Sequence, residues 1–373
     1  HRRAFHAPRP MQFIDLKSQQ ARIRDSIDRR LAALLDHGQY ILGPEVTEME
    51  HGLAAYVGVQ HCVSAASGTD ALLLALMALD IGPGDEVITS PFSFIATAEV
   101  IALVGATPVF VDVDPVSYNL DPGKLEAAIG DRTRAIMPVS LFGLCADMDA
   151  INAIAARHQV PVIEDAAQSF GATYHDRRSC GLSLIGCTSF FPAKPLGCYG
   201  DGGACFTNDA DIALRLKELR NHGQDRQYHH PRIGINGRMD GMQAAVILAK
   251  MEIFDDEVAA RARIGARYSE LLQDSAFVTP AIADGYTSVY AQYTLQVDNR
   301  DAVRKALQDA GIPSAVYYPI TLDQQPALAG RSRVSGDLEV AHALQEKVLS
   351  LPMHPYLDEA TQDQIVGALR AGL

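Results

Sequence analysis

Between residues 62 and 208, short apolar runs of strand length alternate with segments of helical periodicity. Seven runs have the length and composition of buried strands, at residues 61–65, 86–90, 108–113, 135–141, 161–164, 186–191 and 203–207. Before the fifth run, Met148, Ile151 and Ala155 recur at helical spacing behind an N-cap signal. Because strands that alternate with helices build βαβ units, the sequence predicts an α/β fold with a mostly parallel central sheet flanked by helices. The last two runs leave no room for a helix between them, so they predict a hairpin or another antiparallel element.

The pattern changes in the C-terminal part of the chain. From residue 209 it is mainly helical, with a loop at 223–236, and from about residue 256 an α+β pattern follows. That pattern predicts helices and strands, namely helices at 258–272, 300–310, 337–349 and 358–371 and strands at 288–297 and 314–317. We therefore expect a large domain over residues 11–255 and a smaller C-terminal α+β domain over residues 256–373. Residues 1–10 are basic and lack the apolar core of a signal peptide, so we expect a tag or a disordered extension there.

The composition excludes several classes of partner. Of the 373 residues, 48% are hydrophobic and 21% are charged, and the formal net charge is −13. An acidic surface repels nucleic acids and anionic membranes, and no apolar stretch approaches the roughly 20 residues that span a bilayer. An anionic ligand therefore needs a locally positive pocket. The six cysteines form no CxxC pair, which favours buried free thiols and a cytoplasmic location.

Several residues that follow predicted strands have the chemistry of a ligand site. In an open parallel sheet, ligands bind beyond the carboxyl ends of the strands. The segment 67–69 follows the first strand and opens a helix, where free N–H groups can bind a phosphate; a capped helix start is the simpler interpretation. Phe92 and Phe94 follow the second strand and can stack on a flat ring, although a phenylalanine is more often a core residue.

A carboxylate and a lysine follow two later strands. Asp165 comes directly after the fifth strand, where an unpaired buried charge is costly, although it could also cap a helix. Lys194 lies in an apolar segment, where desolvation lowers the pKa of an amine and makes it nucleophilic; a lysine at a loop edge is the alternative. An anion site, a stacking ring, a strand-end aspartate and a lysine are together the parts that a pyridoxal phosphate site requires.

Over residues 11–373, the chain resembles the DegT/DnrJ-type nucleotide-sugar aminotransferases, on the motifs GQYILGPEVTEME, SAASGTDALLLAL, VIEDAAQSFGA, SFFPAKPLGCYGDGG and GINGRMDGMQAA. The resemblance implies the PLP-dependent aspartate-aminotransferase fold (fold type I), pyridoxal 5'-phosphate as cofactor and a homodimer with shared active sites. It implies that Lys194 forms the Schiff base and that Asp165 pairs with the pyridine nitrogen. The further cofactor contacts that it implies are Gln168 at the ring hydroxyl, Phe94 on the ring face, Gly68, Thr69 and Ser189 at the phosphate, and Asn236 at the phosphate of the other subunit.

Further stretches resemble the family members that aminate the 3-keto group of UDP-2-acetamido-2-deoxy-3-keto-D-glucuronic acid, namely MQFIDLKSQQARI, NHGQDRQYHH, SVYAQYT and LPMHPYLD. The likeness implies a UDP-linked keto-sugar and L-glutamate as partners, in the biosynthesis of lipopolysaccharide O-antigen sugars. It implies that Arg238 binds the sugar carboxylate from the partner subunit, as a guanidinium can through two hydrogen bonds. Tyr317 and Tyr318 are candidate sugar contacts, although packing against the second domain is an equal alternative. Phe94 replaces a tyrosine common in close relatives, so stacking is kept and any hydroxyl contact is lost.

The sequence favours other functions less. Related dehydratases of this fold carry histidine at the position of Lys194, so the lysine favours transamination. A lyase of the same fold, a regulator without turnover and an aminotransferase for a 4-keto-6-deoxy sugar stay as alternatives. A nicotinamide dehydrogenase is disfavoured because no GxGxxG follows the first strand. His222, His229 and His230 lack companions at metal-ligand spacing, so we expect no metal there.

Overall fold

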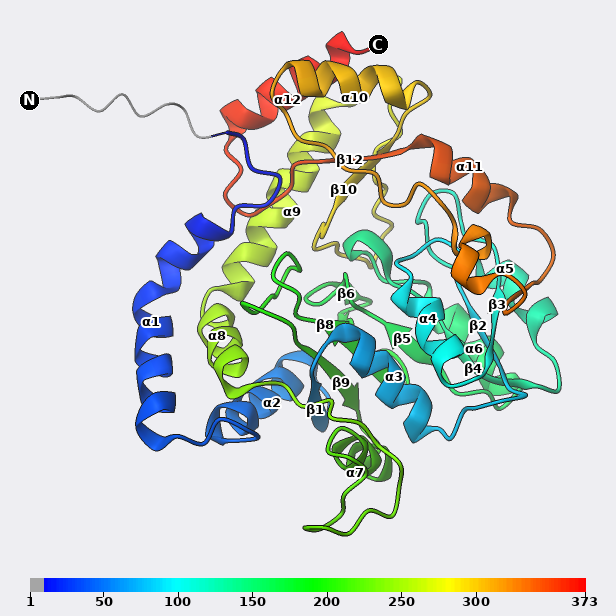
Figure 1. The fold of residues 1–373 in the computed structure, drawn as a ribbon. Coiled ribbons are helices and arrows are strands. Elements are labelled where there is room, and N and C mark those ends of the chain that lie inside the picture. Colours follow the sequence, from blue (N-terminus) through cyan, green and yellow to red (C-terminus); the bar gives the residue numbers. More distant parts are fainter. Residues whose placement is uncertain (1–9) are drawn as a thin grey trace, which may run out of the picture.

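The computed structural model describes residues 10–373, so nine of the ten residues of the expected N-terminal extension lie outside the described residues (Figure 1). Two helices that the apolar runs do not predict come first, α1 (Leu16–His37) and α2 (Pro44–Val57). The side chain of Asp15 caps the start of α1 by accepting a hydrogen bond from the N–H of Ser18. The helix ends at Gly38, whose φ of 71° is a left-handed conformation that glycine adopts without steric cost.

Two four-stranded sheets form the centre of the molecule, in the orders β1-β9-β8-β5 and β4-β2-β3-β11. Their strands are β1 (His61–Ala65), β2 (Glu86–Thr89), β3 (Thr107–Phe110), β4 (Thr133–Met137), β5 (Ile163–Asp165), β8 (Ile185–Ser189), β9 (Gly203–Thr207) and β11 (Arg333–Val334). The parallel bridges Ile136–Val162 and Val139–Asp165 join β4 to β5, so the two sheets continue into each other. Among these strands β9 alone is antiparallel, and it pairs with β1 and β8. The seven predicted strands and the predicted antiparallel element are therefore confirmed.

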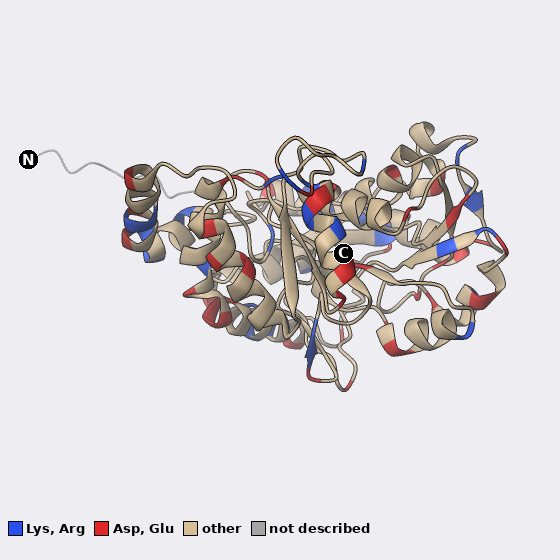
Figure 2. Ribbon diagram, turned by 90° about the horizontal axis from the view of Figure 1, so that it is seen from below, with Lys and Arg blue, Asp and Glu red and all other residues tan. Residues whose placement is uncertain are grey.

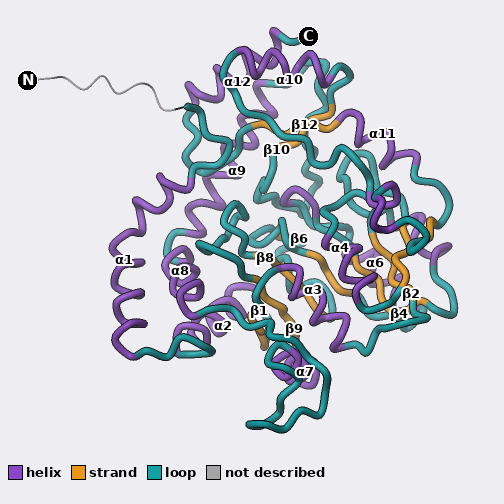
Figure 3. The backbone as a smooth tube through the Cα atoms, in the orientation of Figure 1, coloured by secondary structure: helices purple, strands orange, loops and turns teal. Residues whose placement is uncertain are grey.

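Helices cover both faces of this continuous sheet, as Figure 3 shows. Successive strand residues point to opposite faces; Ile163 packs in the core beneath α3, whereas Val162 packs in the core beneath α6. One face carries α3 (Gly68–Ala78), α4 (Ala96–Leu103) and α7 (Ala210–Leu219). The opposite face carries α2, α5 (Pro122–Leu125), α6 (Met148–Arg157) and α8 (Gly241–Met251). Burial on both faces explains why the strands appear in the sequence as continuous apolar runs.

The C-terminal part contains a small antiparallel sheet of β10 (Tyr293–Gln296) and β12 (Val348–Leu351). It packs among α9 (Phe254–Leu271), α10 (Arg300–Asp309) and α12 (Glu359–Ala371), with α11 (Glu339–Lys347) nearby. A separate two-residue hairpin, β6 (Thr173–Tyr174) and β7 (Arg177–Arg178), lies between β5 and β8 in the chain. The predicted helices of this region are confirmed, with shifted ends.

Three predictions in this region are wrong in part. The predicted strand 314–317 is a single bridge between Ala315 and Ser350, and the predicted strand 288–297 is ordered as a strand only at Tyr293–Gln296. The predicted helix 337–349 ends at Lys347, and the chain continues directly as β12. No glycine or proline separates the helical pattern from the apolar strand here, so the sequence carries no signal for the change.

The boundary near residue 255 stays a prediction. Phe254, the first residue of α9, packs in the core around α2 and α8, whereas Tyr268 packs in the C-terminal core. Strand β11, from the C-terminal part, also pairs in parallel with β3.

Basic and acidic residues are interspersed along the ribbon in Figure 2. Within residues 10–373, no helix combines the length and the apolar composition that a membrane span needs.

Candidate active site

The start of α3 lies against the end of β8, and this contact forms a candidate anion site. A Cβ atom placed on Gly68 would lie 2.6 Å from the Cβ of Ser189, so only glycine allows the two backbones to approach this closely. The Ser67 hydroxyl caps the helix by accepting from the N–H of Asp70 at 3.0 Å. The N–H groups of Gly68 and Thr69 donate no hydrogen bond within residues 10–373. The expected phosphate residues are thus brought together at a helix N-terminus with free donors.

Asp165 ends β5 at the same edge of the sheet, and its carboxylate is held on both oxygens. The Thr97 hydroxyl donates to Oδ2 at 2.8 Å, and the N–H of Ala167 donates to Oδ1 at 3.2 Å. The residue is only 4% exposed. Burial raises its pKa, and the Thr97 and Ala167 donors and the charge of Lys194 oppose that shift. Asp165 therefore does not cap a helix; it is a buried, oriented carboxylate that a cation would stabilise.

Lys194 lies in the loop between β8 and β9. The residue is partly exposed, but its amine is desolvated, which lowers its pKa, while the carboxylate of Asp165 acts in the opposite direction. A lysine of lowered pKa is a better nucleophile, because more of its amine is unprotonated at neutral pH. The charges of Lys194 and Asp165 thus act on each other, and their roles with a cofactor stay predictions.

The Gln168 side chain, three residues after Asp165, makes two hydrogen bonds. Its Oε1 accepts from the N–H of Phe142 at 2.8 Å, and its Nε2 donates to the Tyr318 hydroxyl at 3.0 Å. Gln168 is therefore already engaged twice, and one amide N–H is left for the expected ring hydroxyl. Burial raises the pKa of Tyr318, and also that of Tyr317. The Tyr318 ring packs edge-on against Phe92, a residue of the predicted large domain, and the role of Tyr318 stays a prediction.

The two phenylalanines after β2 have opposite environments. Phe92 is fully buried and stacks near Tyr118, so it is the core residue of the pair. The ring of Phe94 is 55% exposed. An exposed aromatic ring at the open edge of the sheet is available to stack on a flat ligand.

Asn236 and Arg238 lie apart from this group. The segment that carries them runs beside the start of α3, since the N–H of Ala66 donates to the carbonyl of Gly237 at 2.8 Å. Asn236 is exposed. Arg238 donates from Nη1 to Asn221 Oδ1 at 2.8 Å, and its buried Nε has no partner within residues 10–373. No hydrogen bond in that part of the chain joins either residue to Lys194 or Asp165.

Two residues of the site escaped the sequence prediction. Thr97 lies in the segment after β2 that also contains Phe92 and Phe94, so the sequence predicts its position near the edge of the sheet. The sequence does not predict its hydrogen bond to Asp165. Glu164 precedes Asp165 and is fully buried; it accepts from the hydroxyls of Ser179 at 2.7 Å and Ser140 at 3.2 Å. Burial raises its pKa to about 7, against these donors.

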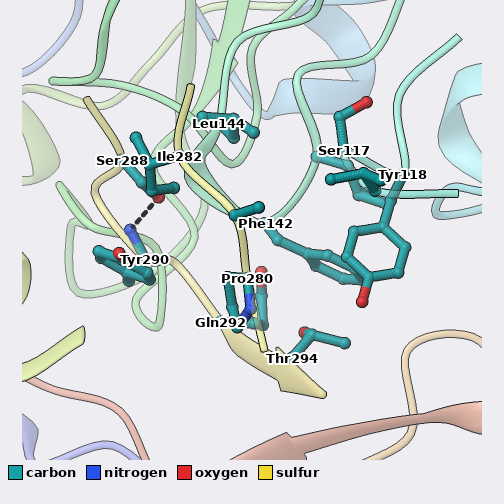
Figure 4. A pocket seen from close by; sticks show the side chains of 13 residues that line it. Ser117, Tyr118, Phe142, Leu144, Pro280, Ile282, Ser288, Tyr290, Gln292 and Thr294 are labelled. Carbon is teal, nitrogen blue, oxygen red and sulfur yellow. Dashed lines mark hydrogen bonds between the residues drawn. The ribbon is translucent and has the colours of Figure 1, made fainter. Parts of the chain in front are cut away.

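Two other features of the described chain lie outside the set of predicted site residues, although Phe142, which lines the first of them, donates its N–H to Gln168. The pocket in Figure 4, among Tyr118, Phe142, Tyr290 and Gln292, has a volume of about 20 Å³, which suits a single water molecule. His229 pairs with Asp225 at 2.6 Å, and His230 contacts the carbonyl of His222. Within residues 10–373, no group of three or more potential ligands is arranged to hold a metal ion.

The chain is similar to known proteins over nearly its whole length. Residues 21–370 match the model of the DegT/DnrJ/EryC1/StrS aminotransferase family. The UDP-2-acetamido-2-deoxy-3-oxo-D-glucuronate aminotransferase of Pseudomonas aeruginosa is 57% identical over 96% of this chain and 99% of its own. The UDP-N-acetyl-3-dehydro-alpha-D-glucosamine 3-aminotransferase of Acidithiobacillus ferrooxidans is 45% identical over 96% and 97%.

A solved structure supports the same relation. The crystal structure of NtdA from Bacillus subtilis with bound cofactor PMP has a TM-score of 0.88 and 30% identity, covering 96% of this chain and 83% of that one. This likeness confirms the predicted fold type I architecture. Because the family model and the relatives match nearly the whole chain, we conclude that the chain belongs to the DegT/DnrJ/EryC1/StrS aminotransferase family.

Proposed function

We propose that the protein is a pyridoxal-phosphate aminotransferase for a UDP-linked sugar. It moves the amino group of L-glutamate to the 3-keto group of UDP-2-acetamido-2-deoxy-3-keto-D-glucuronic acid. The observation that carries this proposal is the 57% identity, over nearly the whole of both chains, to an aminotransferase named for that sugar. The regulator without turnover is disfavoured because Lys194, Asp165 and the free N–H groups at the start of α3 supply the chemical groups that transamination would use.

The site fits pyridoxal phosphate in its donor set. The free N–H groups of Gly68 and Thr69 and the hydroxyl of Ser189 would hold the phosphate. Asp165 is buried with a raised pKa, which is the state of a carboxylate that lacks a cationic partner such as a protonated pyridine nitrogen. Phe94 presents an uncovered ring for stacking, and Gln168 keeps one N–H for the ring hydroxyl. When bound, the cofactor supplies an aldehyde that bonds amines and a ring that withdraws electrons.

The chain's own groups then have distinct tasks. When the cofactor is bound, the Lys194 amine would hold it, and once released the amine would carry a proton between the reacting carbon atoms as general base and acid. Desolvation lowers its pKa, so the amine is available to accept that proton. Asp165 would keep a proton on the ring of the bound cofactor, and the Thr97 hydroxyl fixes the direction of the carboxylate. Two half-reactions of this kind give ping-pong kinetics.

The sugar carboxylate requires a cation, and we assign it to Arg238 of a second subunit. Arg238 is tethered through Nη1, and its Nη2 donates no hydrogen bond within residues 10–373, so this end of the guanidinium would be available to a carboxylate. Asn236 is exposed beside it and would reach the neighbouring phosphate. Exposed apolar side chains near these segments support a homodimer, namely Tyr40, Ile41, Phe191, Tyr199 and Met242. Tyr317 and Tyr318 would contact the sugar from the same chain.

The compartment and the pathway follow from the same proposal. The six cysteines are free and buried, which supports a reducing, cytoplasmic location. The resemblance to enzymes that make diacetamido-uronic acids supports a place in lipopolysaccharide O-antigen biosynthesis.

Mass analysis of the products tests the proposal. The protein is incubated with glutamate and, separately, with the 3-keto-glucuronic acid UDP-sugar, the matching 3-keto sugar without the carboxylate, and a dTDP-linked 4-keto-6-deoxy sugar. We expect the amine mass mainly from the carboxylated 3-keto sugar, together with 2-oxoglutarate. Amination of the 4-keto sugar alone would contradict the substrate assignment, and elimination without amine incorporation would identify a lyase.

A further inference from the structure

Lys250 is a buried cation without a hydrogen-bond partner. It lies on α8, is 1% exposed, and its Nζ donates to no acceptor within residues 10–373. Burial of an ammonium without a partner is costly, and an apolar side chain such as methionine would fill the same space. The position therefore calls for a compensating interaction.

The compensating contact is the ring of Tyr199. The Nζ of Lys250 lies 4.6 Å from the ring centroid, within the range of a cation–π interaction. Gln243, two turns earlier on α8, holds the backbone of the same residue: its Oε1 accepts from the N–H of Tyr199 at 2.8 Å, and its Nε2 donates to the Tyr199 carbonyl at 3.2 Å. Two residues of one helix thus hold one loop residue by its ring and by its backbone.

Tyr199 belongs to the loop that carries Lys194. Two backbone hydrogen bonds tie this loop to its own start. The N–H of Cys198 donates to the carbonyl of Phe190 at 2.7 Å, and the N–H of Lys194 donates to the carbonyl of Phe191 at 2.9 Å. A Cβ on Gly197 would lie 2.5 Å from the Phe191 oxygen, so the turns are in tight contact. A shift of Tyr199 is therefore transmitted to the backbone at Lys194.

We infer that Lys250, acting with Gln243, is a positioning residue: it clamps Tyr199 against α8 and so fixes the loop that presents the Lys194 amine. The inference deepens the proposed function, because it rests on Lys194 being the lysine that bonds the cofactor. It explains why a cation is kept where a methionine would cost less.

The charge state of Lys250 agrees with this role. Burial lowers its pKa to about 8, while the carboxylate of Glu257 on α9 opposes the shift. Burial raises the pKa of Cys198 to about 11, so that thiol is neutral when Lys250 titrates. Lys250 is thus charged at pH 7 and loses its charge above about pH 8, which weakens the contact with the ring.

Hydrogen exchange of the purified protein tests the clamp. In Lys250→Met and Tyr199→Leu, we expect the amides of Cys198 and Tyr199 to exchange about tenfold faster than in the wild type, while the β10 amides keep their rate. Tyr199→Phe keeps the ring face and is the matched control, with wild-type exchange in the loop. The double variant Lys250→Met/Tyr199→Leu should exchange no faster than either single variant, because both remove one interaction.

Catalysis provides a second readout. With glutamate, Lys250→Met should lower kcat about tenfold and leave KM unchanged, and its melting temperature should not fall, because a buried charge is removed. Unchanged loop exchange in Lys250→Met, or multiplied effects in the double variant, would overturn the inference. Faster exchange throughout the protein with a lower melting temperature would do so as well. If Lys194 does not bond the cofactor, loop exchange should still rise in Lys250→Met while kcat stays at the wild-type value, so the two failures are distinguishable.

Discussion

The two halves of the candidate site differ in how their polar groups are satisfied. Around Asp165 and Gln168, partners within the chain hold both carboxylate oxygens and both ends of the amide. At the segment of Asn236 and Arg238, one residue is exposed and the other keeps a buried Nε without a partner in the described chain. We call the half around Asp165 and Gln168 the closed half, because its polar groups are paired within one chain. We call the half around Asn236 and Arg238 the open half.

This difference separates the chemistry from the choice of substrate. Preorganised groups stabilise charge during reaction because they need not rearrange, which suits the half that would hold the cofactor. A guanidinium with only one of its nitrogens paired within the described chain suits the half that would recognise a ligand and a second subunit, because its further partner would arrive from outside. We therefore expect changes in the first half to affect every substrate and changes in the second half to affect carboxylated substrates most.

The largest effect is expected for Lys194→Ala, which removes the amine that both half-reactions need. Turnover should fall by more than about a thousandfold, since a positioned acid–base group alone contributes roughly 10²–10⁴-fold. The visible absorption band of the bound cofactor should change, while circular dichroism stays that of the folded wild type. Lys305→Ala, at an exposed position on α10, is the control. Turnover near the wild-type rate would remove Lys194 from the mechanism.

Asp165→Asn tests the closed half directly. The amide cannot hold a proton on the cofactor ring, so we expect a loss of about 2.7–4 kcal/mol, or a hundredfold to a thousandfold in rate. Both half-reactions should slow to a similar degree, because both use the ring. A rate within tenfold of the wild type would show that Asp165 lacks this role.

Arg238→Ala tests the open half. Binding of the carboxylated keto-sugar should weaken by about 2 kcal/mol or more, roughly thirtyfold, which is the lower range for breaking a buried charge pair. The matching sugar without the carboxylate should lose far less. Measuring KM for both sugars in the same variant gives the answer, and equal losses would place the carboxylate elsewhere. The glutamate half-reaction should be measured alongside, because the same guanidinium could hold the amino acid's side chain.

Thr97→Val is expected to have the smallest effect. It removes the 2.8 Å hydrogen bond to Asp165 while it keeps the shape of the side chain. Loss of one hydrogen bond to a charged group costs about 1.5 kcal/mol at the lower end, or about tenfold in rate. Because that bond lowers the pKa of Asp165, its loss should raise the pKa, so the acid limb of the pH–rate profile should move to higher pH. Thr97→Ser keeps the hydroxyl and should keep the wild-type profile.

The sequence predicted the closed half better than the open half, and the reason is physical. Buried strands have apolar runs of fixed length, so the strand-end places of Asp165 and Lys194 could be read from the sequence. The bonds of Thr97 to Asp165 and of Gln168 to Tyr318 join residues far apart in the chain, and no local pattern encodes them. The roles of Asn236 and Arg238 came from resemblance alone, since periodicity is silent on what a second chain contributes. The sequence does not predict strand β12, because its apolar residues directly follow the helical pattern of α11 with no glycine or proline between them.

The site of the covalent bond to the cofactor tests the central proposal most directly. Borohydride reduction of the protein loaded with pyridoxal phosphate makes that bond permanent, and peptide mass mapping then locates it. We predict one modified lysine per chain, at Lys194, with Lys250 unmodified although Lys250 is the less exposed residue. Modification at Lys250 or another lysine, or no modified peptide after reduction, would contradict the account.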